Sequence, residues 1–433
     1  MAYLAGKRVA ISGAGIGGTT FALALEKACK ARGVKPLPSI TIYERDANAS
    51  DRENLGYSFS IMQAGQGKAA LGGLQVVRNL EQGIVEELAQ LQEPGADSHI
   101  CSQTMQPLIR IGAKRDDTGK TSEIMRIMRS NLRNTLLNHV PPSKVRYSST
   151  CVSAVPSQRE GQPVQLRFAD DSTAECDLLV VADGANSKLR TALLPHEQNR
   201  YAGLCMLFGR THELSKLPPE MAQGHYLVLG KKPSAMFMGC VNRNTVMWSL
   251  SSPAPQSAAN DLNALFRDKA SAQDFLDHEV PQRVAAAGCG GDLLHSIIDR
   301  TDVTSLLALS TMDKLPHPHN DNGIAYVGDA WHPMSPFSGA GANMALVDGW
   351  ELAHELVEGG HSSAQAAIQQ YSEKHTERST IAINQGRRNM GFVTASGLKR
   401  WFLVAGIRTL GIVFGLLKSQ KSLKTIIWPS FRK

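Results

Sequence analysis

A carboxylate and two glycines flank a loop in the last third of the sequence. Residues 324–327 form a short apolar run that stops at Gly-Asp, which predicts a buried parallel strand with Asp329 at its carboxyl end. After a loop rich in Pro and Gly, apolar residues at helical spacing over 346–357 predict a helix, and Gly339 and Gly341 lie at its start. The unpaired N–H groups and positive dipole of a helix start attract an electron-rich ligand edge. A carboxylate accepts hydrogen bonds from hydroxyls.

This combination suits a ligand with a sugar-like chain and an electron-accepting head, and a flavin is such a ligand. The same residues also fit an ordinary strand-loop-helix crossover that binds nothing. The segment alone leaves both interpretations open.

The N-terminal segment carries a glycine-rich loop in the setting that nucleotide binding requires. A strand-like run precedes Gly13-Ala-Gly15-Ile-Gly-Gly18, a helical pattern follows it, and the next strand ends at Glu44. Gly13 allows a tight turn, Gly15 lets the backbone approach a pyrophosphate, and Gly18 lets the helix close on the strand. Glu44 can bind a ribose diol and favours free hydroxyls over a 2′-phosphate. The segment therefore predicts a nucleotide-binding site.

Two further strand-like runs end in residues of the same kind. The apolar run 178–181 is followed by Asp183-Gly184 and by Ser187, which can cap a helix. Acids that follow parallel strands meet at one edge of a sheet, where α/β folds bind ligands. Arg129 lies where another strand passes into a helix, and its guanidinium could hold a phosphate or a ribityl oxygen. Taken alone, Arg129 fits a solvated surface residue better than a ligand contact.

A change of pattern separates residues 193–312 from the rest of the chain. A polar helical stretch near 258–280 follows several strand-like runs, which are 204–211, 226–229, 235–241 and 245–250. This order predicts a second lobe built on an antiparallel sheet.

Apolar and polar side chains on these strands suggest two uses. Met236 and Met238 share a face by their period of two, and three residues on neighbouring strands could extend an apolar wall for a lipophilic substrate, namely Met206, Phe208 and Met247. Methionines in strands also serve as ordinary core residues. The polar groups best placed to orient a substrate are Arg210, His225 and Tyr226, and Arg210 and Tyr226 are the candidate catalytic residues.

Length and composition describe a globular chain of two or three lobes, with 433 residues, 42% apolar and 20% charged. Seven cysteines without a C-x-x-C pair indicate reduced thiols inside a cell. Glycines interrupt the first apolar run too early for a signal peptide. His317, His319 and Asp321 fit a solvated turn better than a metal site, because no further ligands have a recognisable spacing.

The positive charge of the protein is concentrated at its C-terminal end. From Arg378 onward there are 11 Lys and Arg and no acid, so the remaining residues hold 35 basic and 39 acidic side chains. This distribution argues against a nucleic-acid-binding body. The apolar stretch 401–417 contains Arg408 and is short for a membrane span. It either packs on the protein or lies on a membrane surface with nearby basic residues facing anionic lipid, namely Lys399, Arg400, Lys418, Lys421 and Lys424.

Together these motifs resemble the flavoprotein monooxygenases of the p-hydroxybenzoate hydroxylase fold. The resemblance is strongest to the tetracycline-degrading and the fungal or bacterial secondary-metabolite branch. It covers the chain to about residue 390 and depends on four groups of residues in order. These are Gly13-x-Gly15-x-x-Gly18 with Glu44, Arg129-x-x-Leu132, Asp183-Gly184 with Ser187 and Arg190, and Gly328-Asp329-Ala330-x-His332-Pro333 followed by Pro336 and Gly339-x-Gly341-Ala342-Asn343.

The resemblance implies an α/β (α+β) fold in which a Rossmann-type FAD-binding domain is interleaved with an antiparallel-sheet substrate domain. The FAD-binding domain is expected over 1–75, 120–192 and 313–385, and the substrate domain over 76–119 and 193–312. Residues 386–433 form a helical basic tail. The resemblance also implies a cytoplasmic protein. The basic tail leaves association with a membrane surface open as an alternative.

The resemblance also implies roles for individual residues. The Gly13 loop, Glu44 and Arg45 hold the ADP half of FAD, and Arg129 contacts its ribityl or phosphate side. Asp329 binds ribityl hydroxyls, and Asp183-Gly184 serves both FAD and NADPH. The backbone at Gly341, Ala342 and Asn343 faces the N1 and C2 carbonyl edge of the flavin, where a helix start stabilises the negative charge of reduction.

The implied reaction is reduction by NAD(P)H, O2 addition to a C4a-hydroperoxide, and transfer of one oxygen to an apolar or aromatic small molecule, as in secondary metabolism. Trp331 departs from the small residue usual in the family, and either reshapes the pocket edge or packs. The alternatives are a nicotinamide-only dehydrogenase, a flavin halogenase or cyclase of this fold, and a non-catalytic flavin-binding redox sensor. The first leaves Asp183-Gly184 and Gly328-Asp329 without a role, and W-x-W-x-I-P of tryptophan halogenases does not occur in the sequence.

Overall fold

The computed structural model describes the chain over residues 2–49, 57–66, 69, 71–92, 97–111, 124–157, 159, 162–212, 224–230, 233–242, 245–319 and 322–418. These residues form two compact units, each assembled from separate stretches of sequence. Unit 1 comprises Met1–Gln92, Glu123–Ala202 and Thr311–Asn389, and unit 2 comprises Glu93–Ser122, Gly203–Ser310 and Met390–Lys433. Asp321, Lys421, Lys424 and the side chain of Lys418 lie outside the described part of the chain.

The centre of unit 1 is a parallel sheet with the strand order β17-β11-β1-β2-β7. Its strands are β1 (Arg8–Ser12), β2 (Ser39–Tyr43), β7 (Val145–Arg146), β11 (Leu178–Val181) and β17 (Ile324–Tyr326). The apolar runs predict such a sheet because its strands are covered on both faces. Ser12 pairs with Tyr43 and with Val181, and Val181 pairs with Tyr326, so four strands end level at one edge.

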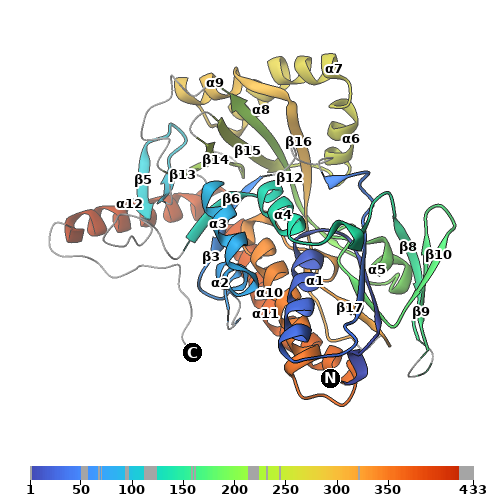
Figure 1. Ribbon diagram of the computed structural model, residues 1–433. Coiled ribbons are helices and arrows are strands. Elements are labelled where there is room, and N and C mark those ends of the chain that lie inside the picture. Colours follow the sequence, from blue (N-terminus) through green and yellow to red (C-terminus); the bar gives the residue numbers. More distant parts are fainter. Residues whose placement is uncertain are drawn as a thin grey trace. The chain divides into compact units, whose positions relative to one another are not determined.

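Two long helices pack against each other in unit 1, α1 (Ile16–Ala31) and α10 (Gly341–Glu358) (Figure 1). Their close approach depends on glycine. A Cβ atom at Gly349 would lie only 2.6 Å from the carbonyl oxygen of Gly17 in α1, while one at Gly18 would lie only 2.3 Å from that of Gly13 in the loop that precedes α1. Real Cβ atoms do not approach backbone atoms this closely, so a larger side chain at either position would push the helix away.

The remaining elements of unit 1 surround this sheet and helix pair. Among them α11 begins at Ala364 and runs without a break to Val393, so that its residues from Met390 on belong to unit 2. The other helices are α2 (Gly73–Leu80), α3 (Gln82–Gln90), α4 (Arg129–Asn138) and α5 (Lys188–Leu193), and the other strands are β3 (Ser58–Met62), β6 (Ile124–Met128), β8 (Cys151–Val155), β9 (Val164–Phe168) and β10 (Thr173–Cys176). β3 and β6 form an antiparallel pair.

Several boundaries differ from the sequence expectation, since residues 193–202, expected in the substrate domain, and residues 386–389, expected in the tail, belong to unit 1. Residues 76–92 were expected in the substrate domain, but α2 and α3 belong to unit 1. Val76, Ile84 and Leu88 are fully buried and join the same apolar core as the α1 and α10 helices. An amphipathic pattern predicts that a helix buries one face but leaves open which body covers it.

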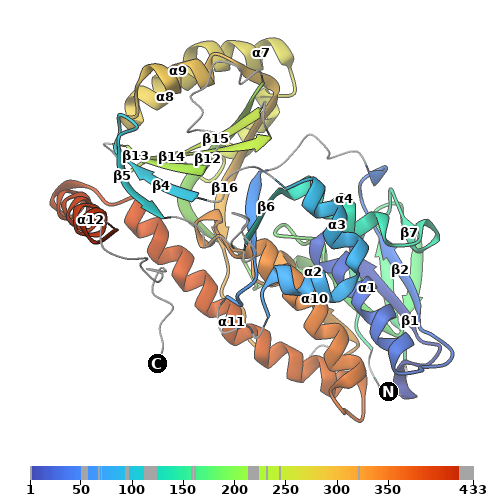
Figure 2. The ribbon, with the colours of Figure 1, turned by 60° about the vertical axis from the view of Figure 1, so that its left-hand side comes forward.

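Unit 2 contains a seven-stranded sheet with the order β16-β12-β15-β14-β13-β4-β5. Its strands are β4 (Asp97–Cys101), β5 (Pro107–Ile111), β12 (Arg200–His212), β13 (Gly224–Leu229), β14 (Ala235–Asn242), β15 (Thr245–Pro253) and β16 (Thr301–Asp313). Figure 2 shows helices beside this sheet, α6 (Ala258–Leu265), α7 (Lys269–Asp274), α8 (Val280–Ala287) and α9 (Asp292–Ile298). The β12, β15, β14 and β13 strands are antiparallel, as predicted, while β13 and β4 are parallel. The predicted fold class is confirmed.

The last described element is α12 (Gly397–Lys418), which packs beside β5 in unit 2. No helix in the described part of the chain has the length and apolar character needed to cross a membrane.

Candidate functional site

The Gly13 loop has the conformation that its glycines predict. Gly13 has a positive φ of 107°, and a Cβ atom there would lie 2.5 Å from the carbonyl oxygen of Ala182. At Gly15 a Cβ atom would meet only that same oxygen, at 3.8 Å, so this glycine faces open space. Gly15 is also the N-cap of α1, and no side chain caps the helix there. A backbone surface with free approach therefore lies at the helix start.

The Glu44 carboxylate is fixed beside this loop. It is buried, and it accepts hydrogen bonds from the backbone N–H of Ala14 at 2.7 Å and of Asp46 at 3.1 Å. The position after β2 thus places an acid next to the glycine loop, as the spacing predicts. Arg45 points elsewhere, with its side chain half exposed and 3.9 Å from Asp46.

Arg133 is a buried residue of this region that sequence reasoning missed. Its guanidinium donates to the carbonyl oxygens of Ala14 and Ala49, each at 3.1 Å, and to the Asp46 carboxylate at 3.3 Å. It therefore ties the glycine loop to the segment after β2. Arg133 follows Arg129 by one helical turn, and this spacing is the only feature of the sequence that points to it.

Two carboxylates at the strand ends have an oxygen without a partner. The Oδ1 atoms of Asp329 and Asp183 are buried and accept no hydrogen bond from any described residue. Burial raises the pKa of Asp329, while the charges of His332 and Arg129 lower it to a smaller extent. Burial likewise raises the pKa of Asp183. Buried acceptors of this kind are normally satisfied, so both are suited to ligand hydroxyls.

A second buried acid holds the loop that carries Asp329. Asp348 is fully buried and accepts from the backbone N–H of Gly328 at 2.7 Å, from His332 Nε2 at 2.6 Å and from Arg378 Nη2 at 2.5 Å. Burial alone would raise the pKa of Asp348, but the charges of His332 and Arg378 hold it well below its ordinary value. The turn at Gly328 is thereby fixed to α10 from within the core.

The start of α10 lies next to Asp329. A Cβ atom at Gly341 would lie 3.7 Å from Asp329 Oδ1, and no side chain caps the helix at Ala340. The buried Asn343 side chain accepts from Met62 N–H at 3.0 Å and donates to Ser60 O at 2.9 Å, which fixes the first turn of α10 to β3. The backbone N–H groups of this turn therefore face a defined direction.

Trp331 packs rather than shaping a pocket edge. It is fully buried, with its ring centroid 4.7 Å from that of Tyr326 and 4.9 Å from that of His319, and the Lys314 ammonium lies 3.9 Å from its centroid. Arg190 donates to Ala330 O at 2.6 Å, which supports the same turn. The described residues contain no His, Cys, Asp or Glu group arranged as a metal site.

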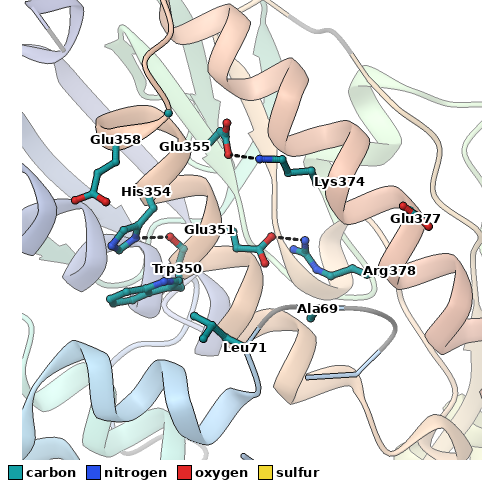
Figure 3. Close-up of a pocket in the computed structure, with 11 residues that line it drawn as sticks. Ala69, Leu71, Trp350, Glu351, His354, Glu355, Glu358, Lys374, Glu377 and Arg378 are labelled. Carbon is teal, nitrogen blue, oxygen red and sulfur yellow. Dashed lines mark hydrogen bonds and ion pairs between the residues drawn. The ribbon is translucent and has the colours of Figure 1, made fainter. Parts of the chain in front are cut away.

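A polar pocket between α10 and α11 is separate from the strand ends. Figure 3 shows that its charged side chains pair with one another, Glu351 with Arg378 and Glu355 with Lys374. Trp350 also lines it, nine residues beyond the α10 start, which is about 13 Å along a helix. None of the strand-end residues lines this pocket.

The sheet register in unit 2 separates the two candidate catalytic residues. Tyr226 lies in one row with Met238 and Trp248, and these side chains join the core that the helices cover. Arg210 pairs with Met247 in the neighbouring row, so it lies on the opposite face with Phe208. Met236 and Met238 are thus core residues, and they do not share a face with Met206, Phe208 or Met247.

Arg210 retains binding capacity on its face of the sheet. Its backbone N–H donates to Ser305 Oγ at 2.7 Å, while its buried Nε atom has no partner among the described residues. His225 is in the same row as Arg210, and its ring centroid lies 6.0 Å from that of Phe237. Tyr226 instead stacks on His99, with ring centroids 4.7 Å apart.

Comparison with known proteins assigns the chain to a family. The sequence profile of the FAD binding domain family matches residues 77–385, and the chain belongs to this family. It is a FAD-dependent monooxygenase with the p-hydroxybenzoate hydroxylase fold, as the resemblance implied.

Individual relatives agree with this assignment. Monooxygenase cfoF of Aspergillus candidus is 28% identical over 413 residues, which cover 92% of this chain and 94% of the relative. Salicylate hydroxylase of Pseudomonas putida is 26% identical over 368 residues, covering 81% of this chain and 76% of the relative. The crystal structure of Klebsiella pneumoniae HpxO complexed with FAD and uric acid is similar in fold, with a TM-score of 0.74, 18% identity, and coverage of 96% of this chain and 97% of that one.

Proposed function

We propose that the strand-end edge of unit 1 binds FAD, and that the enzyme uses NADPH and O2 to insert one oxygen atom into an apolar or aromatic small molecule of secondary metabolism. The balanced reaction consumes substrate, O2, NADPH and a proton, and yields hydroxylated or otherwise oxygenated substrate, NADP+ and water. The observation that carries the proposal is the buried Asp329 Oδ1 atom, which has no partner among the described residues and lies beside the start of α10, where no side chain caps the helix. The names of the relatives support an aromatic substrate.

The ADP half of FAD is assigned to the N-terminal loop. Gly15 leaves room for the pyrophosphate, and the start of α1 supplies N–H donors and a positive dipole. Gly13 and Gly18 allow the loop to fold this way, and Glu44 accepts from the ribose hydroxyls. Arg45, which is half exposed, is assigned to the outer rim of this site.

The flavin half of FAD is assigned to the loop between β17 and α10. Asp329 accepts from ribityl hydroxyls, and Arg129 lies close enough for its charge to act on Asp329. The N–H groups of Gly341, Ala342 and Asn343 supply a positive end for the electron-rich edge of the ring. Asp183-Gly184 would contact FAD and the arriving nicotinamide. Bound there, FAD would supply the redox chemistry, namely acceptance of a hydride from NADPH and activation of O2 for transfer of one oxygen atom.

Substrate orientation is assigned to the Arg210 face of the sheet in unit 2. Arg210 can donate to a carboxylate, phenolate or carbonyl oxygen, and Phe208 and Met247 supply apolar contact on the same face. We propose His225 instead of Tyr226 for this role, because Tyr226 lies in the core that the helices cover.

The test is turnover by the purified, FAD-loaded enzyme with panels of aromatic acids, phenols, polyketides and alkaloids. We expect NADPH oxidation above background for at least one class, and a product heavier by one oxygen atom that carries label from 18O2. A halide-dependent product would instead support the halogenase alternative. A yellow protein that never oxidises NADPH above background would support a redox sensor, and a colourless protein that takes up no FAD would refute the proposal.

A further inference from the structure

The α12 helix has one packed face and one face that the described residues of its unit leave exposed. Leu403 and Ile407 join a small apolar cluster with Ile100 and Leu229 of the sheet, and Ile407 is only 9% exposed. Figure 2 shows α12 alongside β5, consistent with this packing. The packed face fixes the helix to the sheet and determines which side chains point away from it.

The outward face carries the most exposed large apolar side chains in the described part of the chain. Leu398, Trp401 and Phe402 are 78%, 64% and 66% exposed, and their spacing places them on one side of the helix. The Trp401 and Phe402 rings touch edge to face, with centroids 5.1 Å apart. The other exposed large apolar residues are 38–53% exposed and scattered, namely Leu37, Leu91, Val155, Leu265 and Leu315. A contiguous patch of this kind marks an interaction surface.

Charge identifies the partner of this patch. From Met390 to Lys433 the sequence holds eight Lys and Arg and no acid, so residues 1–389 hold 38 basic and 39 acidic side chains. Lys399 is exposed beside the patch, and Arg400 is half-buried with its guanidinium donating to Ala395 O at 3.3 Å. Aromatic and aliphatic side chains next to basic residues on a surface helix are typical of binding to the interface of an anionic membrane.

We propose that α12 docks the enzyme on the surface of a bilayer that contains anionic lipid. Leu398, Trp401 and Phe402 insert among the lipid headgroups, and the exposed Lys399 beside them faces the lipid phosphates. The helix lies in the plane of the interface and does not cross the bilayer. An enzyme with an apolar substrate gains from this position, because such substrates concentrate in membranes. The docking itself does not depend on the proposed reaction.

The experiment is co-sedimentation of the full-length, FAD-loaded protein with extruded vesicles. We expect binding to phosphatidylcholine vesicles with about one third phosphatidylserine to exceed binding to pure phosphatidylcholine by about tenfold at about 0.1 M salt, and to weaken at about 0.5 M salt. The variant L398S/W401S/F402S should lose at least about tenfold in binding. Val155→Ser, which removes an apolar residue 53% exposed elsewhere, should bind as the wild type does.

A second measurement covers the case in which the triple variant is misfolded. The fluorescence that Trp401 contributes, taken as the difference between wild type and Trp401→Phe, should shift to the blue on adding anionic vesicles. Absence of wild-type co-sedimentation, or equal binding by the triple variant, would overturn the proposal. So would a wild-type dimer that the triple substitution converts to a monomer without any vesicle binding, since a second copy would then cover the patch.

Discussion

Asp329 combines a cost to folding with a capacity to bind. Its Oδ1 atom is buried without a partner among the described residues, and burial raises its pKa. We predict that Asp329→Ala weakens FAD binding by about 10- to 100-fold, which corresponds to a lost hydrogen bond to a charged group. The apo-protein should become more stable, because the burial cost of this carboxylate, which outweighs the favourable charges of His332 and Arg129, is removed.

Titration of apo-protein with FAD, followed by flavin fluorescence, measures the first effect, and thermal unfolding of apo-protein measures the second. Asp329→Asn retains one acceptor oxygen. Its FAD affinity and apo-protein stability should therefore lie between those of the wild type and of Asp329→Ala. Undiminished FAD affinity in the Ala variant would mean that Asp329 does not hold the cofactor.

Asp348 should matter for folding more than any surface acid. It is fully buried and accepts from Gly328 N–H, His332 and Arg378. Asp348→Asn leaves the Arg378 charge without this partner in the core, and we predict a loss of about 3–5 kcal/mol in the free energy of unfolding. Chemical unfolding of the apo-protein measures this loss in the free energy of unfolding.

Asp171→Asn is the matched control for this change. Asp171 pairs with Arg167 at 2.5 Å, but its side chain is 80% exposed, so the loss should be about 0–1 kcal/mol. Equal losses in the two variants would contradict a structural role for the buried acid.

The sequence predicts acids such as Glu44 and Asp329 because each directly follows a strand. It does not predict Asp348 or Arg133, whose contacts lie 20 and 119 positions away along the chain. A polar residue in a helix gives no sign of such a partner. For Tyr226 the period of two shows which residues share a face, but not which face the helices cover.

Among the secondary-structure elements, the α1 and α10 pair sets the direction of both helix starts. Their separation depends on glycine, because a Cβ atom at Gly349 would lie 2.6 Å from Gly17 O and 2.7 Å from Phe21 N. We predict that Gly349→Ala destabilises the protein by about 1–3 kcal/mol, as overpacking does, and also lowers FAD affinity by displacing the start of α10.

Gly406→Ala provides the comparison, since Gly406 lies within α12 and, apart from the backbone of that helix, no atom of the described residues lies within 4 Å of its added Cβ. That change should stabilise by about 0.5–1 kcal/mol through helix propensity. Thermal unfolding and FAD titration of both variants are the measurements. A Gly349→Ala protein as stable as wild type would show that the two helices can separate freely.

Strand and helix types in unit 1 follow from sequence because buried parallel strands are continuous apolar runs and their helices start at glycine or serine. The sequence does not predict which of the two units a helix joins. Leu88 of α3 is buried whichever body covers it, and its position in unit 1 depends on contacts with residues distant in sequence. The α11 helix likewise runs through residue 386, where a tail was expected to begin.

For the molecule as a whole, two buried histidines should govern the response to acid. Burial lowers the pKa of His319 to about 3, with the charges of His317 and Lys314 acting in the same direction. Burial also lowers the pKa of His375 well below its ordinary value. Both rings are fully or almost fully enclosed in unit 1, and neither His375 nitrogen has a hydrogen-bond partner among the described residues.

The sign of the effect follows from proton binding. The unfolded chain protonates a histidine near pH 6.5, whereas folded His319 protonates only near pH 3, so the unfolded state binds more protons between these values. The contribution of these histidines to the free energy of unfolding is therefore fully present above pH 6.5. We predict that it falls by about 1.4 kcal/mol per pH unit for each such histidine as the pH decreases towards 3. Urea unfolding of the apo-protein at several pH values between 7 and 5 measures this slope. His319→Asn, which can keep the hydrogen bond to Ser372, should make the slope shallower, and His278→Asn, at an exposed position, should leave it unchanged. An unaltered slope in the His319 variant would show that this ring is already accessible to protons in the folded protein.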